Sequence, residues 1–131
     1  MILIDTSVWI DFLAGRGTET VLQLERAIAD RESLALCGVI LTEVLQGIRD
    51  DAEHRATRER LAMLVLLPME LPVFLRAADV YRTLRKRGVT IRRTNDCLIA
   101  AVALTYDVPL LHADVDFDRI ARVFPLRAVD G

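Results

Sequence analysis

Three short runs of apolar residues constrain the fold of this chain more than any other feature. Ile2-Leu3-Ile4 is continuous and rich in branched side chains, residues 33–37 form a second run, and residues 108–111 form a third. Such runs are typical of strands that are buried on both faces of a sheet. Segments with helical periodicity separate them, so the sequence predicts an α/β fold with a central parallel β-sheet flanked by α-helices on both faces. Periodicity alone does not give the strand order.

The remaining elements are predicted from periodicity and from turn and cap residues. A charged stretch at residues 49–60 is expected to lead into a helix that ends before Pro68, and residues 66–71 and 126–129 are expected to form a brief strand and an edge strand. Further helices are predicted at residues 8–13 (capped by Asp5-Thr6-Ser7), 19–31, 39–48, 72–88, 95–106 (capped by Thr94) and 117–123.

Length and charge indicate a single domain and argue against a DNA-binding protein. The chain has 131 residues, of which 53% are hydrophobic, so we expect a single domain over residues 1–131 with a real core. Seventeen basic residues against nineteen acidic ones give a net charge of −2. Duplex DNA is bound through a strong positive field, so we expect no direct DNA binding by this chain alone.

Cysteine content and hydropathy point to a cytoplasmic protein. Two cysteines make neither a disulfide framework nor, with two histidines, a zinc site. The most apolar window, residues 61–75, is interrupted by Pro68, Glu70 and Pro72. A membrane span needs about 20 apolar residues, and the N-terminus lacks the basic region of a signal peptide. We therefore expect no contact with a membrane.

Four acidic residues lie where a solvated surface residue would not be expected. Asp5 directly follows the first apolar run, and Asp114 follows the third, with Asp116 two residues later. Glu43 lies beside the apolar face of its helix, and Asp96 lies in the first turn of an apolar helix. Ligands of open parallel sheets bind beyond the carboxyl ends of the strands, so we expect these acids to converge there.

A convergent group of carboxylates requires a counter-charge. Two carboxylates about 4 Å apart repel by on the order of 4 kcal/mol at an effective dielectric of 20. Oxygen ligands without Cys or His select a hard cation, which makes Mg²⁺ or Mn²⁺ the expected cofactor. Each acid also has a structural interpretation: Asp5 as a helix cap, Asp96 as a partner of a helix dipole, Glu43 as a side chain that reaches solvent, and Asp114 and Asp116 as turn residues.

Four sequence blocks stand out along the chain: Ile2-Leu3-Ile4-Asp5-Thr6-Ser7-Val8-Trp9, Thr42-Glu43-Val44-Leu45-Gln46-Gly47, Thr94-Asn95-Asp96-Cys97-Leu98-Ile99-Ala100 and Leu111-His112-Ala113-Asp114-Val115-Asp116-Phe117. Together and in this order they resemble PIN domains, in particular VapC-type toxins of VapBC toxin–antitoxin modules. The resemblance covers nearly the whole chain, from Met1 to Phe124.

The resemblance implies a PIN fold and a Mg²⁺- or Mn²⁺-dependent endoribonuclease. Carried over position by position, Asp5, Glu43 and Asp96 look like metal-binding and catalytic acids, with Asp114 as the fourth member. Asp116 matches a second acid of the last block and is a further candidate metal ligand. Every acidic position of the family motif is filled, so the resemblance implies an active enzyme.

The resemblance also implies supporting residues, products and partners. Thr6 and Asn95 match polar residues that orient the acids or the water. Hydrolysis in this family leaves a 5′-phosphate and a 3′-hydroxyl, on substrates such as tRNA or ribosomal RNA. Family members form homodimers and are held inactive by a VapB antitoxin, in a toxin–antitoxin hetero-oligomer.

A basic segment precedes the Asp96 helix. Arg85, Lys86, Arg87, Arg92 and Arg93 occur there without an intervening acid. One interpretation is a solvated helix end, since basic residues favour helix C-termini. The other is a rim that guides RNA phosphates toward the metal site.

Other functions remain as alternatives. A signalling receiver domain has a similar length and an acidic Mg²⁺ pocket, but it needs a Lys near the end of a late strand, and the only Lys is Lys86. A phosphatase of the Asp-x-Asp type would need an acid where Ser7 stands. A PIN nuclease of RNA maturation and a PIN module that binds RNA or protein without cleavage would share these motifs.

Overall fold

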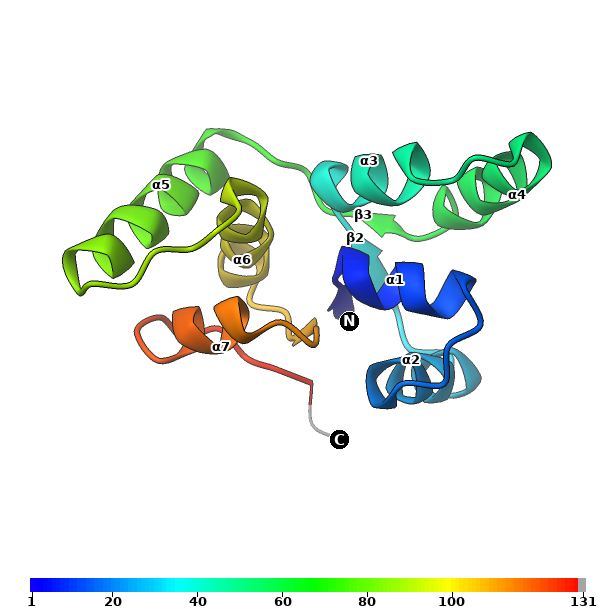
Figure 1. The fold of residues 1–131 in the computed structure, drawn as a ribbon, viewed down its shortest axis with the longest axis horizontal. Coiled ribbons are helices and arrows are strands. Elements are labelled where there is room, and N and C mark those ends of the chain that lie inside the picture. Colours follow the sequence, from blue (N-terminus) through cyan, green and yellow to red (C-terminus); the bar gives the residue numbers. More distant parts are fainter. Residues whose placement is uncertain (130–131) are drawn as a thin grey trace.

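A parallel four-stranded sheet forms the centre of the molecule, and helices lie on both of its faces (Figure 1). The computed structural model describes residues 1–129, which contain four strands and seven helices. In chain order the elements are β1 (Ile2–Ile4), α1 (Thr6–Leu13), α2 (Glu19–Ala29), β2 (Leu34–Leu36), α3 (Gly38–Gln46), α4 (Asp51–Leu61), β3 (Val65–Leu66), α5 (Leu71–Lys86), α6 (Thr94–Tyr106), β4 (Leu110–Leu111) and α7 (Val115–Ala121). The predicted fold class is confirmed.

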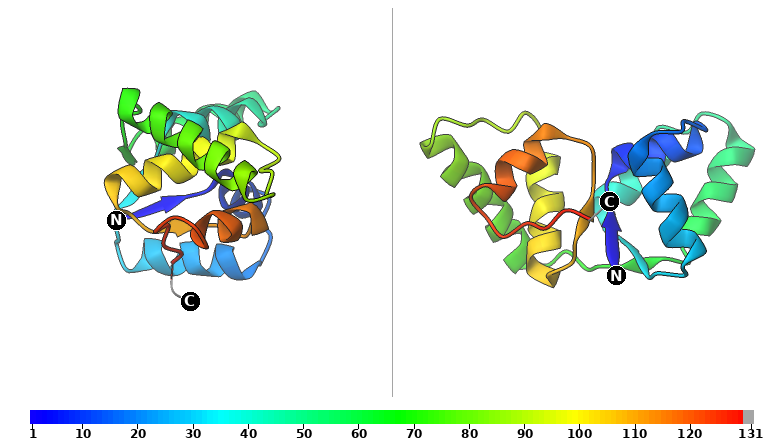
Figure 2. Two further views of the ribbon diagram at one scale, coloured as in Figure 1. Left: turned by 90° about the vertical axis from the view of Figure 1, so that its left-hand side faces the viewer. Right: turned by 90° about the horizontal axis from the view of Figure 1, so that it is seen from below.

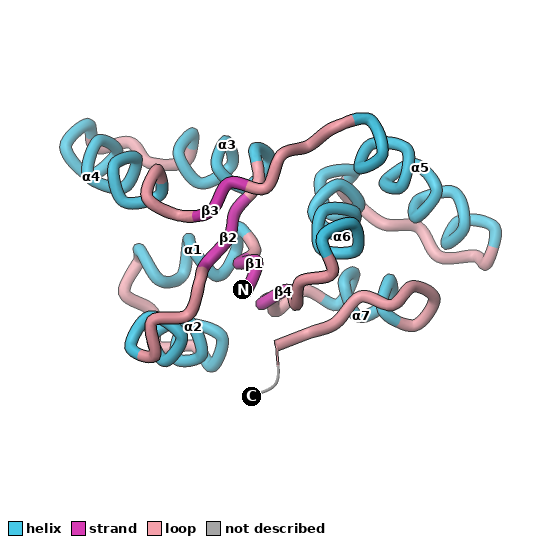
Figure 3. Tube along the Cα trace, turned by 180° about the vertical axis from the view of Figure 1, so that it is seen from behind, coloured by secondary structure: helices cyan, strands magenta, loops and turns pink. Residues whose placement is uncertain are grey.

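The sheet has the order β3-β2-β1-β4 with all pairs parallel, as Figure 3 shows from behind. Leu3 pairs with both Ala35 of β2 and Leu110 of β4. From β1 the chain passes to β2 and β3 on one side, and β4 then returns to the other side of β1. The boundary between β1 and β4 is therefore the topological switch point, where ligands of open α/β sheets bind.

Two groups of helices enclose the sheet. Helices α1 to α4 lie on one side and α5 to α7 on the other, and Figure 2 shows β1 between the two groups. Leu3 and Ile4 of β1 and Ala35 of β2 have no exposed surface. Strands β1, β2 and β4 are buried, which explains why their sequences are uninterrupted apolar runs, whereas both residues of the edge strand β3 are exposed. Within residues 1–129, no helix has both the length and the apolar character to cross a bilayer.

The charged stretch at residues 49–60 differs from the prediction. It does not lead into a helix but is itself helix α4, with Asp50 as the N-cap, whose carboxylate accepts from the Glu53 amide. Acidic residues in the first turn and basic residues in the last complement the helix dipole. Only Thr57 and Leu61 are buried, so this helix has too few apolar positions to show a clear periodicity.

Three smaller predictions are also corrected. Thr94 does not cap α6 but is its first residue, because the Asp96 amide already donates to the Arg93 carbonyl at 3.1 Å. The brief strand lies at Val65–Leu66 and ends before Pro68, which has no amide to donate. The expected edge strand at residues 126–129 is reduced to one isolated bridge between Leu110 and Ala128.

Candidate metal centre and active site

The two strands at the switch point each deliver an aspartate to the same edge of the sheet. Asp5 follows β1 directly and is the N-cap of α1, and Asp114 follows β4 and is the N-cap of α7. The Asp5 amide donates to the Leu111 carbonyl at 3.0 Å, which ties the end of β1 to the end of β4. Asp96 reaches the site from the first turn of α6.

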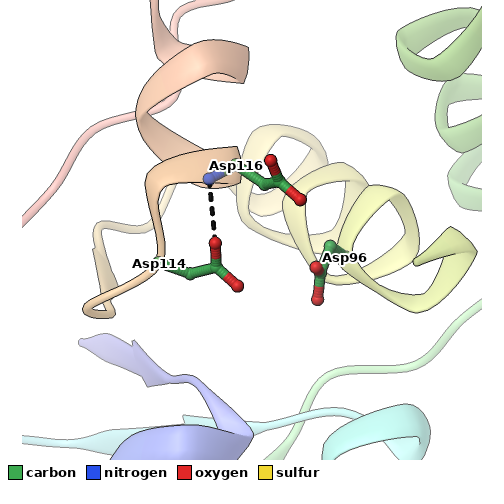
Figure 4. A group of neighbouring side chains, drawn as sticks. All are labelled: Asp96, Asp114 and Asp116. Carbon is green, nitrogen blue, oxygen red and sulfur yellow. Dashed lines mark hydrogen bonds between the residues drawn. The ribbon is translucent and has the colours of Figure 1, made fainter. Parts of the chain in front are cut away.

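Three carboxylates come together in this region. Asp96, Asp114 and Asp116 each offer an oxygen atom within 4.8 Å of the others, and Figure 4 shows them converging from the starts of α6 and α7. The Asp114 Oδ1 atom accepts from the Asp116 amide at 2.9 Å, which fixes the turn that presents both residues. Asp5 and Glu43 do not belong to this group of three.

Asp5 is held by the start of its own helix. Its side chain is buried, and its Oδ2 atom accepts from the Ser7 hydroxyl at 2.6 Å and from the Ser7 amide at 3.3 Å. Burial raises the pKa of Asp5, and the hydrogen bonds from Ser7 partly oppose that rise. The capping interpretation of Asp5 is therefore correct as far as it goes, but one carboxylate can both cap a helix and contribute to the site.

Asp96 is the acid whose charge is least compensated. Burial, followed by the negative charges of Asp114 and Asp5, raises its pKa to about 6. Its Oδ2 atom is buried and has no hydrogen-bond partner within residues 1–129. A buried carboxylate oxygen without a partner is costly, and a cation bound here would offset that cost.

A divalent hard cation fits this donor set. The candidate ligand atoms are carboxylate oxygens from Asp96, Asp114 and Asp116, with Asp5 near enough to raise the pKa of Asp96. No Cys or His belongs to the group, which favours Mg²⁺ or Mn²⁺ over zinc or copper. Either ion would supply the counter-charge that the orphaned Asp96 oxygen lacks.

Glu43 lies on α3 beside the group and is oriented by the two polar residues predicted to support it. Its Oε1 atom accepts from the Thr6 hydroxyl at 2.8 Å, and its Oε2 atom accepts from the Asn95 amide at 3.3 Å. Thr6 follows Asp5, and Asn95 precedes Asp96, so Glu43 is connected to both aspartates through their neighbours. A pocket of about 440 Å³, with Met69 and Phe74 among its walls, opens beside Glu43 and Asn95.

The basic segment divides into two parts. Arg92 contacts the acids: its Nε atom is 3.5 Å from Asp116 Oδ2, and its Nη2 atom is 3.9 Å from Asp114 Oδ1. Arg85, at the end of α5, donates instead to the Tyr81 hydroxyl at 3.2 Å. Within residues 1–129, Lys86, Arg87 and Arg93 are exposed and form no ion pair with the acids.

One contributing residue was missed in the sequence. Arg119 donates to Asp116 Oδ1 at 2.7 Å. The spacing of three residues from Asp116 to Arg119 on a helix was the signal for this contact. The His112 side chain is largely buried: its Nδ1 atom accepts from the Asp114 amide at 3.2 Å, and its ring packs on Phe117.

Comparison with known proteins identifies the family. The family model "PIN domain" matches residues 2–123. Ribonuclease VapC11 of Mycobacterium tuberculosis is 37% identical over 98% of this chain and 97% of the relative, and ribonuclease VapC21 of the same species is 31% identical over 73% of this chain and 71% of the relative.

Solved structures show the same fold. The VapBC-5 structure of Mycobacterium tuberculosis superposes with a TM-score of 0.72 at 25% identity, over 98% of this chain and 97% of that chain. VapBC-1 from nontypeable Haemophilus influenzae gives a TM-score of 0.75 at 23% identity, over 99% and 98%. With its motif acids, its fold and these relatives in agreement, the chain belongs to the PIN-domain family and, within it, to the VapC group.

Proposed function

We propose that this protein is a Mg²⁺- or Mn²⁺-dependent endoribonuclease and the toxin of a VapBC-type toxin–antitoxin module. The observation that carries the proposal is the buried Asp96 oxygen, which has no partner among the described residues and lies among the carboxylates at the switch point of the sheet. The relatives that match over nearly the whole chain are ribonucleases by name. These relatives support RNA as the substrate, with tRNA or ribosomal RNA as the expected targets.

The residues of the site divide into two tasks. Asp5, Asp96 and Asp114 would hold the metal; Asp5 and Asp96 are buried, and Asp114 is half-buried at the border of the site. Glu43, oriented by Thr6 and Asn95, would accept a proton from the attacking water or hold that water. When bound, the metal makes a nucleophile available near neutral pH and neutralises charge that develops on the phosphate. Attack by water predicts products with a 5′-phosphate and a 3′-hydroxyl.

The direct test is cleavage of total cellular RNA by purified protein that is free of antitoxin. We expect cleavage with Mg²⁺ or Mn²⁺, none with a chelator, and none with Asp5→Asn or Asp96→Asn. Asp79→Asn, at an exposed position of α5, is the matched control and should cleave like the unmodified protein. A 2′,3′-cyclic phosphate product would contradict attack by water, and a lack of cleavage under every condition would favour a PIN module that only binds.

An antitoxin partner is supported by an apolar pocket on the side of the sheet opposite α5. This pocket, of about 470 Å³, is lined by Trp9, Phe12, Ile28 and Met63 among others. The Trp9 Nε1 donor is buried without a partner within residues 1–129. A peptide with apolar side chains and a free acceptor fits such a pocket. The solved structures that share this fold are described as VapBC, which supports a VapB-type antitoxin as the partner.

We further propose a homodimer that acts in the cytoplasm, where its RNA substrate is found. Leu71, Phe74 and Leu75 at the start of α5 are all exposed, and an exposed apolar patch of this kind is typical of a protein interface. The mass of the protein in solution, measured by light scattering, tests the dimer. A PIN nuclease of RNA maturation would share the active site, and the absence of a cognate antitoxin would favour it.

A further inference from the structure

Asp116 differs from the other acids because both of its oxygens already have cationic partners. Its Oδ1 atom accepts from Arg119 Nη1 at 2.7 Å. Its Oδ2 atom lies 3.5 Å from both the Nε atom and the backbone amide of Arg92. The residue has no exposed surface. A buried carboxylate enclosed by two guanidinium groups has its charge compensated without a metal.

Arg92 is fixed at its base and free at its tip. The preceding residue, Ile91, is buried in the core and anchors the segment between α5 and α6. Asp116 holds the backbone amide and the Nε atom of Arg92. The Arg92 side chain is nevertheless 69% exposed, and its Nη2 atom lies 3.9 Å from Asp114 Oδ1. The outer edge of the guanidinium therefore faces solvent at the border of the acidic group.

An arginine held in this way is suited to bind phosphate. The planar guanidinium presents paired donors that match the oxygens of a phosphate. A free arginine side chain loses conformational entropy when it is immobilised. Because Asp116 orders the side chain before the ligand arrives, less of that cost falls on binding.

We propose that Asp116 is a positioning residue rather than a metal ligand, and that Arg92, which it holds, binds a phosphate of the RNA next to the metal site. This inference rests on the proposed nuclease function. Of the five residues of the basic segment, it assigns phosphate binding to Arg92 alone. It also leaves Asp5, Glu43, Asp96 and Asp114 as the acids that serve the metal.

The first experiment measures RNA affinity in a chelator, so that no cleavage occurs. Fluorescence anisotropy of a labelled single-stranded RNA of mixed sequence is recorded for Arg92→Gln, Asp116→Asn and the double variant. We expect each single change to weaken binding on the order of tenfold, the effect of losing one charged hydrogen bond. The double variant should be no weaker than Arg92→Gln, because Asp116 acts through Arg92. Arg92→Lys should restore part of the affinity.

Salt dependence separates a phosphate contact from a general loss of charge. Removal of one contact to single-stranded RNA should make the slope of log affinity against log salt shallower by about 0.7. We expect this change for Arg92→Gln. The matched control is Arg122→Gln at the end of α7, which removes an arginine that forms no ion pair within residues 1–129. Equal effects of the two substitutions would overturn the proposal.

Calorimetric titration with Mn²⁺ gives a readout that is independent of RNA. Asp116→Asn should bind Mn²⁺ about as tightly as the unmodified protein, whereas Asp96→Asn should not. A loss of Mn²⁺ affinity in Asp116→Asn equal to that in Asp96→Asn, together with full RNA affinity of Arg92→Gln, would show that Asp116 is a metal ligand. If Asp116→Asn does not fold, the RNA affinity of Arg92→Gln, a change at an exposed residue, decides whether the proposal stands.

The failure of this inference can be told apart from a failure of the proposed function. If the unmodified protein cleaves RNA with Mn²⁺ but Arg92→Gln binds RNA as tightly as before, only the inference is wrong. If the unmodified protein does not cleave RNA at all, the nuclease function is wrong. In the cleavage assay, Arg92→Gln should raise KM more than it lowers kcat, which a general loss of structure would not do.

Discussion

Replacement of Asp96 by asparagine is expected to stabilise the metal-free protein at neutral pH. The substitution keeps the shape of the side chain and removes a charge that the fold does not compensate. Burial and the neighbouring Asp114 and Asp5 raise the pKa of Asp96 from 3.8 to about 6. A shift of that size corresponds to about 3 kcal/mol between the two protonation states.

The sign of the effect follows from linkage. A group whose pKa is raised in the folded state contributes stability that is fully present below pH 3.8 and is lost as the pH rises through about 6. The loss is complete above that range. Asp96→Asn has no carboxyl group to titrate at this position and does not lose this stability. Its free energy of unfolding, relative to that of the unmodified protein, should therefore increase between pH 4 and pH 8 by up to about 3 kcal/mol.

Urea unfolding in a chelator, followed by circular dichroism at several pH values, measures this difference. Asp79→Asn, at an exposed position of α5, controls for the loss of a carboxylate as such. Addition of Mn²⁺ should reverse the order at pH 8, because a cation at 1,000 times its Kd stabilises a protein that binds it by about 4.1 kcal/mol. The reasoning would be refuted if the difference in unfolding free energy between Asp96→Asn and the unmodified protein did not change with pH. It would also be refuted if the advantage of Asp96→Asn were smaller at pH 8 than at pH 4.

Three further outcomes are expected. Thr6→Val removes the hydroxyl that donates to Glu43 and should lower the cleavage rate on the order of tenfold with little change in stability. Thr6→Ser keeps the hydroxyl and should cleave at the unmodified rate. Equal rates of the two variants would contradict a role of Thr6 in orienting Glu43. Asp50→Ala removes the cap of α4 and should cost about 1 kcal/mol in urea unfolding while RNA cleavage stays unchanged. Binding of an antitoxin should change the fluorescence of Trp9, the only tryptophan, and an unchanged spectrum in a formed complex would place the antitoxin elsewhere.

The sequence was sufficient for the parts of the site that depend on local order. Asp5 and Asp114 follow apolar strands, so their position at one edge of the sheet follows from the parallel topology alone. The charged helix α4 was harder, because its stability comes from a cap and from the helix dipole more than from an apolar face. The strand order depends on long-range packing that has no local signature.

Contacts between distant segments could not be predicted from pattern. Glu43 is 37 residues from Thr6 and 52 residues from Asn95, and only the folded chain brings their polar atoms within hydrogen-bond distance. The role of Asp116 also depends on a contact between distant segments. Its spacing from Asp114 made it a candidate metal ligand, whereas its pairing with Arg92, 24 residues earlier in the chain, appears only in the structure.

The most direct test of the central claim is a Mn²⁺ titration that follows metal binding and RNA cleavage in the same buffer. Calorimetry reports binding and gel electrophoresis reports cleavage, for the unmodified protein and for Asp96→Asn. The account predicts that cleavage rises over the concentration range in which Mn²⁺ binds, and that Asp96→Asn loses both. Cleavage that persists in a chelator, or Mn²⁺ binding that Asp96→Asn leaves unchanged, would contradict it.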